Sequence, residues 1–328
     1  MQTPASYRSS PASSAWRCWC RALVLLVFGA GLALASQAQA QVTCNVTFTN
    51  VAFGSIDVLP GTQIDGSGTL TTSCTGLTGT SKVILCHRLD NGTYPLSGSD
   101  RQMGSGTNRL SFNIFQDLGR SIIWNSTGTG ILGVVLTATV PSVVTPVYAR
   151  VPGSQQSVPP AAYTTTITSS IYGSLYTGVN PACSTQNSLL GTRTFTVTAT
   201  VVSSCTVTTT TLNFGTATLL TANIDSTSSV SVVCTQTTPY QVRLNGGVAA
   251  AVNPALRKMS LGANTISYGL YRDAARGLYW GATDGTDTQA GTGTSAATAH
   301  TVYGRIPPQA SQPPGIYTDT VVVIVSFM

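Results

Sequence analysis

Acidic side chains and histidines are scarce in this sequence. It contains no glutamate and only two histidines, His87 and His300, and charged residues make up 8% of the chain. General acid–base and paired-carboxylate mechanisms need such groups close together, and no suitable pair of aspartates stands out. No His/Cys spacing is typical of a zinc site either. We therefore predict that the protein is not an enzyme and binds no metal or cofactor.

Long apolar runs are absent after the first forty residues. A short apolar segment, residues 22–35, follows three arginines and precedes the cleavage signal Ala38-Gln39-Ala40. This order is typical of a signal peptide, which we place at residues 1–40, and the segment is too short to favour a membrane span. We expect a secreted protein whose mature chain begins at Gln41.

Lysine occurs only twice, and the arginines are scattered along the chain. Nucleic acid and anionic membrane surfaces are therefore not expected as partners. Threonine, serine, glycine and valine are abundant instead, a composition that favours short strands over amphipathic helices. Alternating apolar residues such as Leu110, Phe112 and Ile114 fit strands, and clusters of Gly, Asn and Pro separate such segments as turns do.

Six cysteines follow residue 40, and an even number in an exported chain indicates disulfides. An internal repeat selects among the possible pairings. Cys-x-Val-Thr, followed by Phe-Gly, begins at Cys44 and again at Cys205, and a Cys-Thr pair follows at Cys74 and Cys234. By analogy between the copies, we expect the disulfides Cys44–Cys74, Cys205–Cys234 and, from the remaining two cysteines, Cys86–Cys183.

The repeat continues through the rest of both copies. The motif Asp-x-x-Arg-x-x-x-Trp begins at Asp117 and at Asp273 with identical spacing, and Val-Tyr-x-Arg-x-Pro begins at Val147 and at Val302. Because both copies carry the Asp–Arg motif, we interpret it as a structural turn or ion pair rather than a functional site. The fold we predict is all-β, with two tandem immunoglobulin-like β-sandwiches.

The two copies end differently. Copy one continues into a strictly alternating segment with apolar residues at Phe195, Val197, Ala199 and Val201. Copy two runs through the alternate positions Val321, Val323, Val325 and Phe327 and then ends. The second sandwich is therefore expected to lack its final strand.

A sandwich without an edge strand exposes an apolar groove that another chain can fill. We accordingly predict a self-complemented domain over residues 41–202 and a strand-accepting domain over residues 203–328. Only Gln41, Val42 and Thr43 precede Cys44, too few to donate a strand. A subunit that accepts a strand but donates none would end a polymer. The alternative, which stays open here, is that residues 193–202 begin the second module.

The residues that carry a family resemblance lie mainly in copy two. They are Cys205-Thr-Val with Phe214-Gly215 and Cys234, the segment from Tyr268 to Trp280, and the ending Pro314-Gly-Ile-Tyr-Thr-Asp-Thr-Val-Val-Val. Both copies resemble spore coat protein U domains, the pilin-like family of archaic (Csu-type) chaperone–usher pili. Copy one is more divergent, because it has Cys86, Cys183 and an insertion at residues 169–190.

This resemblance implies a function and a set of partners. Two-domain members resemble tip adhesins, so it implies attachment and biofilm formation by a pilus tip at the cell surface, after export through the periplasm. The implied partners are a periplasmic chaperone, an outer-membrane usher, an adjacent pilin subunit that donates a strand, and an abiotic or host surface. Phe327 fits a C-terminal strand that pairs with the chaperone. The alternative function is a secreted, spore-coat-like envelope protein without a pilus.

Adhesion has candidate residues in copy one. Residues 281–301 of copy two are polar, whereas the matching stretch of copy one and its insertion are apolar, and large exposed apolar patches mark interaction sites. The predicted surface-binding residues are Ile131, Leu132, Val134, Val135, Ile171, Tyr172, Leu175 and Tyr176. The alternative is that Val134–Val140 is a buried strand paired with Val144–Val151.

Overall fold

The structure is a computed structural model that describes residues 41–327. The predicted signal peptide, with Cys18 and Cys20, lies outside these residues. The described chain forms eighteen β-strands and three single-turn 3₁₀ helices, η1 (Gly128–Gly130), η2 (Cys183–Thr185) and η3 (Pro254–Leu256). None of the helices in this range has the length and hydropathy to span a membrane. The predicted all-β fold of two immunoglobulin-like sandwiches is confirmed.

The first module contains the strands β1 (Thr43–Phe48), β2 (Val51–Ile56), β3 (Ile64–Thr75), β4 (Lys82–Leu89), β5 (Arg101–Ser105), β6 (Asn108–Phe115), β7 (Leu132–Thr137), β8 (Ser142–Val151), β9 (Ala161–Tyr176) and β10 (Leu189–Val201). One layer has the order β1-β3-β8-β6-β5, and the other has the order β2-β10-β9-β4-β7. A single residue pair between β5 and β9, Gly104 with Thr164, joins the layers. The alternating residues Leu110, Phe112 and Ile114 of β6 are fully buried between them.

The second module contains the strands β11 (Cys205–Thr209), β12 (Ile224–Cys234), β13 (Pro239–Leu244), β14 (Arg257–Leu261), β15 (Asn264–Tyr271), β16 (Gln289–Thr292), β17 (Thr298–Ile306) and β18 (Val323–Phe327). Its layers have the orders β11-β12-β17-β15-β14 and β16-β13-β18. Eight strands of the first module thus have a counterpart in the second. Among the described residues, β2 and β10 have none.

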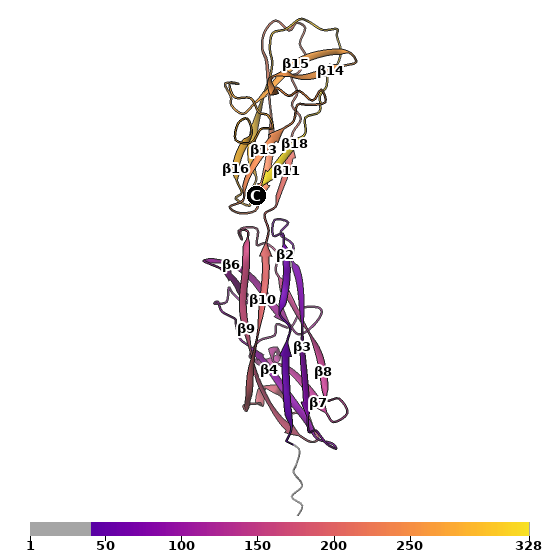
Figure 1. The fold of residues 1–328 in the computed structure, drawn as a ribbon, viewed down its shortest axis with the longest axis vertical. Helices are drawn as coiled ribbons and strands as arrows, with labels where there is room; N and C mark the ends of the chain where they lie inside the picture. The colour runs from indigo at the N-terminus through magenta and orange to yellow at the C-terminus, as the bar shows by residue number, and fades with distance from the viewer. Residues whose placement is uncertain (1–40, 328) are drawn as a thin grey trace, which may run out of the picture. The chain divides into compact units, whose positions relative to one another are not determined.

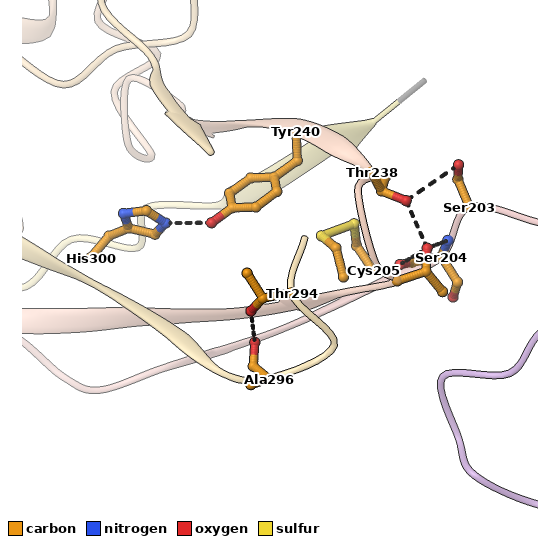
Figure 2. Close-up of a disulfide and its surroundings, with 10 residues drawn as sticks. Ser203, Ser204, Cys205, Thr238, Tyr240, Thr294, Ala296 and His300 are labelled. Carbon is orange, nitrogen blue, oxygen red and sulfur yellow. Dashed lines mark hydrogen bonds between the residues drawn. A yellow bond between two sulfur atoms is a disulfide. The ribbon is translucent and has the colours of Figure 1, made fainter. Parts of the chain in front are cut away.

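The disulfides join strands in the expected way. Cys44 lies directly opposite Cys74 in the β1–β3 pair, and Cys205 lies directly opposite Cys234 in the β11–β12 pair. The third disulfide, Cys86–Cys183, ties β4 to η2. Figure 2 shows the surroundings of the Cys205 disulfide, where the Thr238 hydroxyl lies within hydrogen-bonding reach of Ser203 and Tyr240 points to His300.

The Asp-x-x-Arg motif forms the same turn in both modules. The Asp117 carboxylate accepts bonds from the backbone of Ser121 and Ile122, and Asp273 does the same for Gly277 and Leu278. The arginines of the two motifs form the ion pairs Arg120–Asp65 and Arg276–Asp225. The interpretation of this motif as a structural turn with an ion pair is confirmed.

Candidate functional site

β10 occupies a slot inside the first module. It pairs antiparallel with β9 and parallel with β2, and Figure 1 shows it between these two strands. The alternating residues Phe195, Val197, Ala199 and Val201 are each at most 3% exposed. Residues 193–201 are therefore part of the first module in this structure, which decides between the two alternatives that the sequence left open.

Within residues 41–327, no strand fills the corresponding slot of the second module. By the repeat, Tyr317–Val321 stands where Tyr163–Ile167 of β9 stands, and Leu212–Ala217 stands where β2 stands. Between these two segments lie adjoining cavities of about 510 and 620 Å³. Both cavities are lined by Leu212, Asn213, Phe214, Met259, Ile316 and Tyr317. We call this space the acceptor groove.

The floor of the acceptor groove contains a group of apolar side chains. Its lining includes the buried side chains Val230, Leu244, Leu270 and Val302, and the half-buried Val321 and Val323. Along one edge β18 pairs with β13, and no described strand pairs with its other edge. Of the four predicted C-terminal positions, Val323, Val325 and Phe327 lie in β18, whereas Val321 lies just before it. The geometry is that of a sandwich with an unpaired edge over an apolar core.

One polar pair lies on this floor. The Tyr268 hydroxyl donates to Asp319 Oδ2 over 2.6 Å, and the backbone N–H groups of Val248 and Thr320 each donate to Oδ1 over 2.8 Å. Burial, together with the bond to Asp319, raises the pKa of Tyr268 above its ordinary value. In the first module Phe112 and Thr165 occupy the positions of Tyr268 and Asp319. The sequence analysis did not identify this pair, although Asp319 lies inside the family ending.

Three loops meet at one end of the first module. Lys82 at the start of β4 pairs with Thr137 at the end of β7 and with Tyr176 at the end of β9. The loops at residues 76–81, 138–141 and 177–182 therefore lie at the same end. This end is opposite Val201, where the chain leaves the module, since Val201 pairs with Ala161 at the start of β9.

Most of the predicted surface-binding residues are not on the surface, so that prediction is corrected. Ile131, Val134 and Ile171 are 8%, 5% and 4% exposed. Leu132, Val135, Tyr172 and Tyr176 are half-buried. Leu175 alone among the eight is exposed, at 55%. The physical reason is that β7 and β9 flank β4, so these residues belong to strands. The alternative of a buried strand is right for Val134, but β7 pairs with β4 rather than with Val144–Val151, and Val140 is exposed in the turn that follows β7.

Four residues of that set, Ile131, Val135, Tyr172 and Tyr176, belong to a second, smaller core. Ile84, Cys86 and Ile131 are its buried members, and Val135, Tyr172, Tyr176 and Cys183 pack against them. Arg88 covers the cluster, because its guanidinium lies 4.2 Å from the centre of the Tyr172 ring and donates to the backbone oxygens of Cys183 and Gln186. β4 is therefore covered on both faces.

The exposed apolar side chains near this end lie in or beside the loops instead. Val179 is 92% exposed, Leu175 is 55% exposed and Val140 is 49% exposed. Val140 closes the turn between β7 and β8, where its backbone exchanges bonds with Thr137. We call Val140, Leu175 and Val179 the loop-end patch.

The chain matches the family model described as Spore Coat Protein U domain over residues 31–170 and 191–324. It is 34% identical over 127 residues to Protein U of Myxococcus xanthus, an alignment that covers 35% of this chain and 70% of that protein. In three dimensions it is similar to a chain of the CsuC–CsuE chaperone–tip adhesion subunit pre-assembly complex, from archaic chaperone–usher Csu pili of Acinetobacter baumannii. The two chains are 17% identical, with a TM-score of 0.51, and the match covers 87% of this chain and 100% of that chain. The CupB6 tip adhesin from Pseudomonas aeruginosa matches with 10% identity, a TM-score of 0.42, and coverage of 87% and 95%.

Proposed function

Since the chain belongs to the Spore Coat Protein U domain family, we propose that it is a non-catalytic subunit of a chaperone–usher pilus whose second module accepts a strand from another subunit. The observation that carries this proposal is internal to the chain. The slot that β10 fills in the first module is an open groove with apolar side chains on its floor in the second. This one chain thus contains both a complete and an incomplete form of the same sandwich.

A donated strand would stabilise the second module in two ways. Its backbone would pair with the open edge, and its alternate side chains would fill the groove as Phe195, Val197 and Val201 fill the first module. Each large apolar side chain buried in this way contributes about 1.5–3 kcal/mol. Before assembly the same groove would be covered by a periplasmic chaperone, which would deliver the subunit to an outer-membrane usher.

We place the subunit at the tip of the pilus. The segment directly before the second module is β10, and β10 is already paired on both edges within the first module. It is therefore not available for donation to a neighbour. In this proposal residues 41–202 form the adhesin domain, and residues 203–328 form the pilin domain that joins it to the shaft.

Attachment to an abiotic or host surface, and biofilm formation, would then fall to the loop-end patch. Its three side chains lie in or beside the loops at the end of the first module opposite Val201, and each is about half exposed or more. Exposed apolar groups that lie together mark interaction surfaces. This patch replaces the larger set of residues that the sequence analysis nominated.

The acceptor proposal can be tested by supplying the strand in cis. Residues 193–202 are appended after residue 328 through a flexible linker long enough for residue 193 to pair opposite Val323, as Arg193 pairs opposite Ser169 in the first module. The unfolding midpoint of the second module, followed by Trp280 fluorescence, should rise. The matched control appends the same segment with Asp at the positions of Phe195 and Val197. An equal midpoint for both extensions would rule out the acceptor role.

Position in the pilus is tested by immunogold electron microscopy with an antibody against the first module. Gold particles confined to fibre ends are the expected result. Gold along the shafts would contradict the tip position. Gold spread over an envelope without fibres would favour the alternative function, a coat-like structural protein.

A further inference from the structure

We infer that the strand that fills the acceptor groove carries a serine or threonine at the position opposite Asp319, within an otherwise apolar set of inward side chains. This inference rests on the proposed function, since it specifies the partner of the same groove. It follows from a difference in polarity between the filled slot and the open one.

The first module supplies the register. Val197 of β10 lies directly opposite Thr165 of β9, and both side chains are buried, at 0% and 2% exposure. Thr165 corresponds to Asp319, because each follows the repeated Tyr-Thr pair by one residue. A donor strand in the second module would therefore place one inward side chain directly beside the Asp319 carboxylate.

The carboxylate is held in place by the second module itself. Oδ1 accepts two backbone bonds, from Val248 and Thr320, and Oδ2 accepts one bond, from the Tyr268 hydroxyl. A carboxylate has about four acceptor sites, so one site on Oδ2 is left without a partner among the described residues. Both Asp319 and Tyr268 line the smaller of the two cavities of the groove, beside the buried side chains Val230, Leu244 and Val302, where a donor strand would exclude water.

The two modules have exchanged the position of one acidic residue. In the first module Asp90 binds the backbone N–H groups of Gly92 and Thr168, and in the second Asn245 does so for Gly247 and Val322. The carboxylate thus lies in a turn in the first module but faces the groove in the second. In both cases it lies near a fully buried arginine, Arg101 or Arg257, whose charge it partly offsets.

Filling the groove changes the surroundings of Asp319. Burying a carboxylate acceptor without a partner is unfavourable, whereas a hydrogen bond to a charged group is among the stronger ones in proteins. An inward valine at this position would leave the remaining site of Oδ2 unpaired. An inward serine or threonine hydroxyl would donate to it, while its size suits a position that holds Val197 in the first module.

The test uses the full chain and three peptides. The parent peptide has the sequence of residues 193–202, one variant carries Val197→Thr, and the control variant carries Ala199→Thr. The control moves the hydroxyl to the position opposite Tyr317. Binding is measured by fluorescence polarisation with labelled peptides. We expect the Val197→Thr peptide to bind about ten-fold more tightly than the parent, which corresponds to one charge-assisted hydrogen bond, and the Ala199→Thr peptide to show no gain.

A variant chain tests the origin of the preference. The D319T chain carries threonine, as the first module does at Thr165. In this variant the Val197→Thr peptide should no longer bind more tightly than the parent peptide, while the parent peptide still binds. Equal or weaker binding of the Val197→Thr peptide to the unmodified chain would overturn this inference and leave the acceptor role intact. Failure of all three peptides to bind would overturn the proposed acceptor role itself. These two failures are therefore distinguishable.

Discussion

Three core residues of the first module are polar where the second module has valine. Thr72, His87 and Ser169 correspond to Val232, Val242 and Val323. The match of His87 with Val242 is fixed by the tryptophan of each module, since Trp124 donates to the backbone oxygen of His87 and Trp280 donates to that of Val242. None of the three polar side chains has a hydrogen-bond partner among the described residues. Such groups lower the stability of a core.

His87 should therefore make the first module sensitive to acid. Its ring is fully buried against Phe48 and Trp124, and burial lowers its pKa from 6.5 to about 4, because the core cannot solvate an imidazolium. Above pH 6.5 the ring is neutral in both the folded and the unfolded chain. Between pH 6.5 and 4 only the unfolded chain gains a proton, so the free energy of unfolding falls, by up to about 3 kcal/mol.

The variant H87V tests this effect. It should be more stable than the unmodified chain at pH 7 and should lose less stability between pH 7 and pH 4.5. Denaturant unfolding is followed by Trp124 fluorescence, with W280F as the background so that only the first module reports. Because the acidic residues titrate alike in both proteins, the difference between them isolates His87. Parallel pH profiles would contradict the prediction.

At the scale of single elements, β10 determines whether a sandwich is complete. It is not an edge strand, because it pairs with β9 along one edge and with β2 along the other. Its inward side chains are part of the main core of the first module. Stability of the first module should therefore depend on these side chains far more than on the outward ones.

V197D should unfold the first module, and T200D should not. Val197 is fully buried, so an aspartate there places an unpaired charge in the core, which costs more than about 4 kcal/mol. Thr200 is exposed on the same strand, and the same substitution there should change the free energy of unfolding by less than about 1 kcal/mol. Limited proteolysis and Trp124 fluorescence distinguish the two results. Equal tolerance of both substitutions would show that β10 is dispensable.

Much of the element order could be predicted from the sequence, because the repeat supplied an internal alignment. The disulfide pairings, the turn at Asp117 and the missing counterpart of β10 all follow from it. The burial of the apolar side chains in β7 and β9 could not be predicted from the repeat. β4 is buried on both faces, inward by the main core and outward by the cluster around Cys86 and Cys183. Strands beside it are apolar at successive positions, as Val134, Val135 and Leu136 are, and this resembles an exposed apolar loop in sequence.

The sequence did not reveal the polar pair Tyr268–Asp319, for a different physical reason. The hydrogen bond between Tyr268 and Asp319 joins residues 51 positions apart, and neither residue forms a recognisable motif with the other. Asp319 faces the groove because no described strand lies beside it, whereas β10 covers the equivalent Thr165 in the first module. Only the comparison of the two modules in three dimensions shows this difference. Local sequence patterns therefore predicted the strand better than the chemistry of the slot.

At the scale of the whole molecule, the two modules differ in what each leaves exposed. The first is complete and has an insertion whose disulfide, Cys86–Cys183, holds η2 against β4. The second has a short, polar β16 where the first has β7, and it has an open groove. These differences include the two regions that we propose to contact a surface and another subunit.

Attachment should depend on the loop-end patch but not on exposed apolar residues in general. The triple variant V140S, L175S and V179S removes all three apolar side chains of the loop-end patch, each of them about half exposed or more. Since none of them is buried in the core, folding and pilus assembly should be unaffected. Adhesion of cells to a hydrophobic surface should fall at least ten-fold, measured with pili counted by electron microscopy.

The control for that experiment is a second triple variant, L96S, L118S and I122S. These side chains are 40%, 71% and 42% exposed, and they lie in loops outside the patch. If attachment depends on general surface hydrophobicity, both variants should lose it to a similar extent. If it depends on the three loops that meet at the ends of β4, β7 and β9, only the first variant should lose it. Undiminished attachment of the first variant, with normal pili, would remove the loop-end patch from the proposed function while leaving the strand-accepting role of the second module unchanged.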